Sequence, residues 1–153
     1  MGTRSIIGLK TGLGWFGRYC HWDGYPEGVG AGVWHIVQRD GVAEAVKTLI
    51  TDNYSWSCLT TATEPDTENE RGDKFVAGYG YAHCDGEPDD IITDKGDKWG
   101  TEYAYIISRE GLAVMSVDYE GVTQELGFYR WDMNGEPDFV IRARERFGKQ
   151  VTA

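Results

Sequence analysis

The chain has 153 residues, of which 41% are hydrophobic and 26% charged, and its formal net charge is −10 at pH 7. This length suits one folded domain with its own core, so we expect a single domain over residues 1–153. The negative charge repels phosphate backbones, which argues against nucleic-acid binding. No run of 18 apolar residues and no secretory signal peptide can be recognised, so we expect a cytoplasmic protein without a membrane contact.

The N-terminal third predicts a β-hairpin followed by two helices. Residues 4–9 and 15–22 have strand character and flank the Gly-rich turn at residues 11–14. A helical segment around Val33 should end near Asp40-Gly41. In the next segment apolar residues recur at i, i+3, i+4, i+7 and i+8, which predicts an amphipathic helix that packs on the sheet. These residues are Val42, Ala45, Val46, Leu49 and Ile50.

The rest of the chain predicts further strands and one ambiguous tail. Residues 60–74 are polar and predict an exposed loop. The extended segments are residues 75–84, 103–108, 112–119 and 126–131, and an acidic loop lies at residues 85–98. The tail before Gly148 favours a helix, although its alternating arginines also suit an edge strand. The predicted fold class is α+β: a mostly antiparallel sheet of five or six strands with two or three helices on one face.

One nonapeptide pattern occurs twice. Tyr19-Cys-His-Trp-Asp-Gly-Tyr-Pro-Glu27 returns as Tyr81-Ala-His-Cys-Asp-Gly-Glu-Pro-Asp89. In an extended segment the Tyr, His and Asp of each copy share one face just before a Gly/Pro turn. If the repeat reflects a shared role, the two strands should lie in one sheet with their histidines on the same side. We favour an arrangement with both Asp-Gly turns at one end, where Asp23 and Asp85 would frame one pocket mouth.

These segments predict a binding site for a small ligand. Aromatic side chains crowd both copies, and aromatic faces suit a nucleobase or another flat group. Guanidinium groups near the first copy could contact an anion. The predicted ligand-binding residues are Arg4, Arg18, Tyr19, His21, Asp23, Tyr25, Tyr81, His83 and Asp85. We predict no metal and no cofactor.

The N-terminal Met1-Gly-Thr-Arg4 and the segment Trp22-Asp-Gly-Tyr-Pro-Glu-Gly28 resemble a group of small uncharacterised proteins of phages, bacteria and fungi. Those proteins begin Met-Gly-Thr-Arg and continue to a Trp/Phe-Asp-Gly-Tyr-Pro-x-Gly-x-Gly segment. Some members have Gln at the position of His21, which implies a loop-shaping or ligand-holding role rather than an obligatory catalytic histidine. The leading hypothesis is a non-catalytic phage-type accessory protein that binds a small ligand, including a nucleotide-derived signal of host immunity. Its location would then be the host cytoplasm.

Two alternatives stay open. In the first, His21 and His83 act as general acid and base of a phosphoester hydrolase, which requires both imidazoles to converge on one substrate atom. In the second, the acidic segment binds a basic host protein or mimics DNA. That segment, residues 64–102, holds twelve acidic against four basic residues. A homo-oligomer is a further class of partner.

Overall fold

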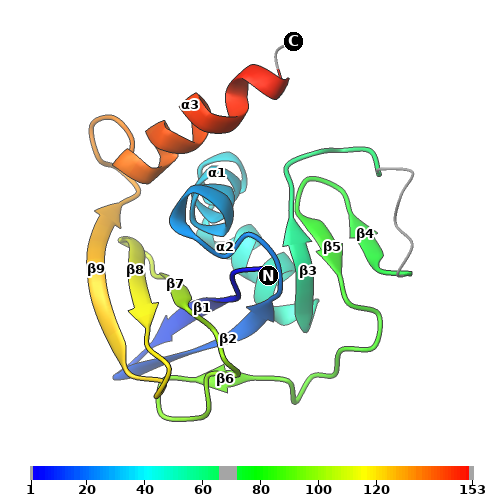
Figure 1. The fold of residues 1–153 in the computed structure, drawn as a ribbon, viewed down its shortest axis with the longest axis vertical. Coiled ribbons are helices and arrows are strands. Elements are labelled where there is room, and N and C mark those ends of the chain that lie inside the picture. The colour runs from blue at the N-terminus through cyan, green and yellow to red at the C-terminus, as the bar shows by residue number, and fades with distance from the viewer. Residues whose placement is uncertain (1, 66–71, 152–153) are drawn as a thin grey trace.

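A computed structural model describes residues 2–65 and 72–151, and within these ranges the strands form one mixed sheet (Figure 1). The sheet order is β4-β5-β3-β2-β1-β7-β8-β9, and β6 pairs with β2 beside β3. The strands are β1 (Ser5–Thr11), β2 (Gly14–Cys20), β3 (Ser55–Leu59), β4 (Lys74–Val76), β5 (Gly80–Ala82), β6 (Ile92–Thr93), β7 (Tyr103–Ile107), β8 (Gly111–Val117) and β9 (Thr123–Arg130).

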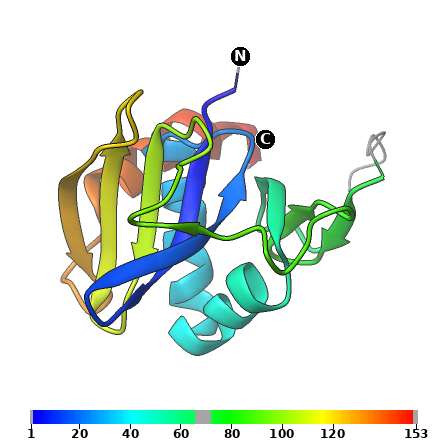
Figure 2. The same ribbon diagram turned by 90° about the horizontal axis from the view of Figure 1, so that it is seen from below.

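All helices lie on one side of this sheet (Figures 1 and 2). They are η1 (Pro26–Gly30), α1 (Ala31–Asp40), α2 (Val42–Val46), η2 (Lys47–Thr51) and α3 (Asp138–Val151), where η marks a wider π-type turn. Helix α1 ends at Gly41, whose φ of 86° favours glycine and whose N–H donates to the Val37 carbonyl. None of the helices in the described ranges is both long and apolar enough to cross a membrane.

Alternation along the central strands builds an apolar layer on each face of the sheet. Ile7, Cys20 and Trp56 point toward the helices and are fully buried there. Ile6 points to the opposite face, where it packs with Ile92 of the acidic segment. Burying an isoleucine or leucine side chain contributes about 1.5–3 kcal/mol, so both layers stabilise the sheet.

The α+β class is confirmed, and the sheet is larger than predicted. The N-terminal hairpin, both helical segments before residue 52, and the helical tail are present. The predicted strand at residues 75–84 is split into β4 and β5, and β3 and β6 were not predicted. The sheet is mostly antiparallel, but β1 pairs with β7 and β2 with β3 in parallel. Such pairings join distant parts of the chain and have no local sequence pattern.

The acidic segment covers the second face of the sheet. After β5 the chain crosses that face, and the short strand β6 pairs with β2 (Figure 2). Lys98 is only 6% exposed, and its ammonium donates to the backbone carbonyls of Asp94 and Gly96. Residues 66–71, which belong to the predicted loop and the acidic segment, lie outside the described residues.

Asp40, at the end of α1, should make stability depend on acid pH. The Arg39 guanidinium and the Tyr79 hydroxyl both donate to its carboxylate, and they lower its pKa from 3.8 to about 2. A carboxyl with a lowered pKa in the folded state contributes stability above about pH 3.8, and this contribution is lost as the pH falls toward about 2. We therefore expect Asp40→Asn to unfold more readily than the wild type in urea near neutral pH, with the difference shrinking over that acid range.

The exposed Asp89 supplies the control for this measurement. Asp89→Asn, at an exposed position outside the contacts of Asp40, should leave the free energy of unfolding near neutral pH unchanged. A constant difference between Asp40→Asn and the wild type from neutral pH down to about pH 2 would contradict the assignment to this carboxyl.

Candidate functional site

The two copies of the nonapeptide lie in one sheet, separated by a single strand. Strand β2 carries the first copy and runs parallel to β3, whereas β5 carries the second and runs antiparallel to β3. Tyr19 is the register partner of Ser55, and the His83 N–H donates to the Ser55 carbonyl. Tyr19, Ser55 and His83 therefore form one row across the same face of the sheet, as predicted for the histidine-bearing sides.

The predicted position of the two turns is wrong. Because β2 and β5 run in opposite directions, their Asp-Gly turns leave the sheet at opposite ends. Asp23 lines a large cavity, whereas Asp85 is exposed elsewhere and does not line it. The two carboxylates thus do not frame a common pocket mouth.

The two motif histidines bind different hydroxyl groups. His21 Nδ1 is 2.7 Å from the Tyr19 hydroxyl, and His83 Nδ1 is 2.8 Å from the Ser55 hydroxyl. His21 lines a small hollow that His83 does not share. The convergence of both imidazoles on one atom, which the hydrolase alternative requires, has no support in these contacts.

Arg18 has a structural position that does not suit the predicted anion contact. Its side chain is 5% exposed, and its guanidinium donates to the carbonyls of Ile50, Pro88 and Asp90 at 2.8, 2.9 and 2.9 Å. It thereby ties the end of the helical pair and the acidic segment to β2. Tyr81 also packs locally, with its ring 5.2 Å from that of Phe75.

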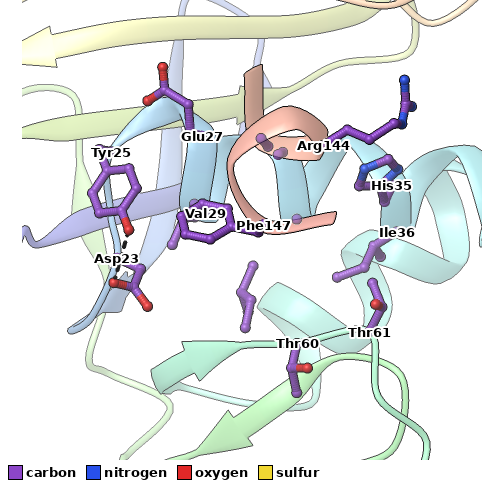
Figure 3. Close-up of a pocket in the computed structure, with 15 residues that line it drawn as sticks. Asp23, Tyr25, Glu27, Val29, His35, Ile36, Thr60, Thr61, Arg144 and Phe147 are labelled. Atoms are coloured by element: carbon purple, nitrogen blue, oxygen red, sulfur yellow. Dashed lines mark hydrogen bonds between the residues drawn. The ribbon is translucent and has the colours of Figure 1, made fainter. Parts of the chain in front are cut away.

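A cavity of about 610 Å³ opens on the helix side of the sheet (Figure 3). It lies between the loop after β2, helix α1, the end of β3 and helix α3. Its lining is mainly apolar, with a few charged and hydroxyl-bearing side chains. The lining residues are Asp23, Tyr25, Glu27, Gly28, Val29, Ala31, Gly32, His35, Ile36, Leu59, Thr60, Thr61, Ala143, Arg144 and Phe147. Of the nine predicted residues, Asp23 and Tyr25 are the two that line it.

The loop after β2 is shaped by a left-handed residue and by close backbone packing. Asp23 has φ 58°, a conformation that Asp tolerates better than most residues. The buried Tyr105 hydroxyl donates to the Gly24 carbonyl and holds the turn against the sheet. At Gly28 a Cβ atom would lie 2.1 Å from the Asp23 carbonyl oxygen, so only glycine permits this approach.

Most charges around the cavity are already paired. Arg142 Nε lies 2.8 Å from Glu27 Oε2, and this contact helps to lower the Glu27 pKa against the opposing effect of burial. Arg144 binds both oxygens of Glu136, at 2.6 and 2.7 Å. Asp23 forms no ion pair within the described residues, but the Tyr25 hydroxyl donates to it at 3.3 Å. The site is therefore a largely apolar hollow in which Glu27 is paired and the Asp23 carboxylate has no cationic partner within the described residues.

His35 lines the cavity and was not predicted. It lies on α1, across the cavity from Asp23 and Tyr25 (Figure 3). Burial of part of the ring lowers its pKa, so the neutral imidazole, which both donates and accepts, dominates at neutral pH. The signal in the sequence was the row of small residues Gly28, Ala31 and Gly32, which share a helical face with His35 and leave space beside it.

Arg4 and His21 line the second hollow, which measures about 370 Å³ on the opposite side of the sheet. Within the described ranges no group of three or more His, Cys, Asp or Glu side chains is placed to hold a metal ion. Comparison of the chain with protein-family models, curated proteins and solved structures finds no match.

The structural role of Arg18 predicts a large loss of stability on replacement. Arg18→Met keeps much of the side-chain volume and removes all three donors, so three carbonyls lose charge-assisted hydrogen bonds. We expect the free energy of unfolding in urea to fall by about 2–4 kcal/mol. The exposed Arg109 provides the control, and Arg109→Met should change stability by less than about 0.5 kcal/mol. Equal effects of the two substitutions would contradict the role given to Arg18.

Proposed function

We propose that the protein is a non-catalytic, phage-type accessory protein that binds a small ligand in the 610 Å³ cavity. The observation that carries the proposal is the cavity itself. Its volume falls within the range of about 300–1,000 Å³ typical of ligand pockets, and a mainly apolar lining with few polar groups is their usual composition. Asp23 and Tyr25, from the first copy of the nonapeptide, contribute to its wall.

The side chains favour a ligand with a flat ring. Tyr25 and Phe147 line the cavity with aromatic rings, and the Arg146 guanidinium lies 5.6 Å from the Tyr25 ring centre and 5.1 Å from that of Phe147. A ring bound there would be lined by apolar carbon below and by aromatic and guanidinium groups above. Thr60 and Thr61 add hydroxyl groups along one edge (Figure 3).

The charges restrict how a nucleotide-derived immune signal would bind. Phosphate groups near Asp23 would be repelled, because that carboxylate has no cationic partner in the described residues. On the α3 side Arg144 is bound to Glu136, whereas Arg146 forms no ion pair within the described residues and would meet phosphate oxygens more favourably. The signal would therefore place its base toward Tyr25 and its phosphates toward α3.

The structure offers less support for the two other hypotheses. The hydrolase lacks a shared cavity for His21 and His83 among the described pockets. Binding of a basic host protein to residues 64–102 stays a prediction, and part of that segment is instead used to cover the sheet, as the complete burial of Ile92 illustrates.

Gly32 on α1 lines the cavity, so a large substitution there can block it and a small substitution at the same position can serve as the control. A Cβ atom there would lie 3.6 Å from Leu59 atoms, an ordinary contact. Gly32→Ala should therefore fit and raise the free energy of unfolding by about 0.5–1 kcal/mol, because alanine favours the helix. Gly32→Phe should fill the space that a ligand needs.

Calorimetry against cyclic dinucleotides and cyclic ADP-ribose isomers tests the proposal. Wild type and Gly32→Ala should bind at least one of them with similar affinity, and Gly32→Phe should bind it about 100-fold more weakly, a loss of about 2.7 kcal/mol. Absence of heat with every compound at micromolar protein would refute sequestration of these signals. Undiminished binding by a folded Gly32→Phe variant would refute the assignment to this cavity.

A further inference from the structure

The second hollow is bordered by an aromatic cluster on the sheet face that points away from the helices. The rings of Tyr19 and Trp99 lie 5.9 Å apart, those of Tyr19 and His21 5.8 Å, and those of His21 and Trp22 4.6 Å. Trp99 remains 39% exposed despite these contacts. A large exposed indole beside a hollow is a typical feature of a binding surface.

The backbone at Trp99 has a left-handed conformation, and the indole that it carries is partly exposed. Trp99 has φ 57°, and with Asp23 it is one of two non-glycine residues with positive φ in the described ranges. A bulky side chain in this conformation is unfavourable and persists where the surroundings require it. Gly100 follows, also with positive φ, and a Cβ there would lie 3.6 Å from a guanidinium nitrogen of Arg4.

Two opposite charges line the hollow without pairing. The Glu102 N–H donates to the Arg4 carbonyl at 2.8 Å, so the two residues are neighbours. Their side chains are exposed and form no ion pair with each other, and within the described residues neither makes a side-chain hydrogen bond. The other lining residues are Gly2, His21, Trp22 and Gly100.

This combination selects the class of ligand. An anion would be attracted by Arg4 and repelled by Glu102, whereas a cation would be attracted by Glu102 and repelled by Arg4. A pyranose ring satisfies both, because its hydroxyl groups donate to a carboxylate and accept from a guanidinium. Its face of C–H groups packs on an aromatic ring. Trp22 lines the hollow, and the exposed Trp99 indole adjoins the lining residue Gly100 in the chain. We infer that the hollow lined by Arg4, Trp22 and Glu102, with the Trp99 indole exposed beside it, is a binding site for a neutral saccharide.

This site is independent of the proposed function. It lies on the opposite side of the sheet from the 610 Å³ cavity and shares no lining residue with it. A volume of about 370 Å³ is at the small end of ligand pockets, which suits one or two sugar rings. Gly32→Phe, which fills the large cavity, should leave saccharide binding unchanged.

Saturation-transfer NMR with maltotriose, cellotriose and chitotriose tests the inference on the full chain. At least one should bind saturably with a dissociation constant of about 0.1–10 mM, as expected for a small, open site. Arg4→Gln and Glu102→Gln should each weaken it about 10-fold, since each removes charge-assisted hydrogen bonds. Tyr119→Ala, which alters a side chain that is 96% exposed outside the hollow, should have no effect.

Trp99→Gly separates binding from folding. It removes the indole and relieves the left-handed backbone, so sugar binding should be lost while the urea midpoint does not fall. AMP serves as the anionic probe. Binding of AMP to the wild type more tightly than any of the three sugars, with steep weakening by about 0.5 M salt, would identify an anion site and overturn the inference. It is also overturned if none of the three sugars saturates by about 20 mM.

Discussion

The pairing of β2 is the constraint on which both hollows depend. This strand bonds to β1 along its whole length, to β3 at its C-terminal end and to β6 at its N-terminal part. Because neighbouring side chains of a strand point to opposite faces, Tyr19 faces away from the helices and Cys20 toward them. At the end of β2 the left-handed Asp23 redirects the chain to the helix side. One short segment therefore supplies residues to a hollow on each side of the sheet.

Charge pairing distinguishes the two hollows. Around the larger cavity α3 brings arginines to Glu27 and Glu136, so ligand binding there would rely on apolar surface and aromatic faces more than on net charge. On the other face Arg4 and Glu102 have no such partners within the described residues. Unpaired exposed charges gain little from each other through water, but they provide directional hydrogen bonds to a ligand with hydroxyl groups.

The sequence predicts the locally encoded elements well. The N-terminal hairpin follows from its Gly-rich turn, and the helix after Gly41 follows from apolar residues spaced by three and four. Strand β3 escaped prediction because its alternating run, Ser55-Trp-Ser-Cys, is short and serine is not among the residues enriched in strands. Its burial comes from its position between β2 and β5, whose register partners Cys20 and Ala82 lie 36 and 26 residues from Trp56 in the chain. Strand β6 was not predicted for a similar reason, because its two residues become a strand only by pairing with the distant β2.

By itself the sequence determined that each nonapeptide would end a strand at an Asp-Gly turn, because alternation and turn chemistry act over a few residues. The tertiary structure alone decided the relative direction of the two strands. Their direction depends on which edges of β3 they pair with, and hydrogen bonding along a strand edge admits parallel and antiparallel partners alike. That choice separated Asp23 from Asp85. It also joined Asp23 to His35 and Phe147, residues that only the packing of α1 and α3 brings to one cavity.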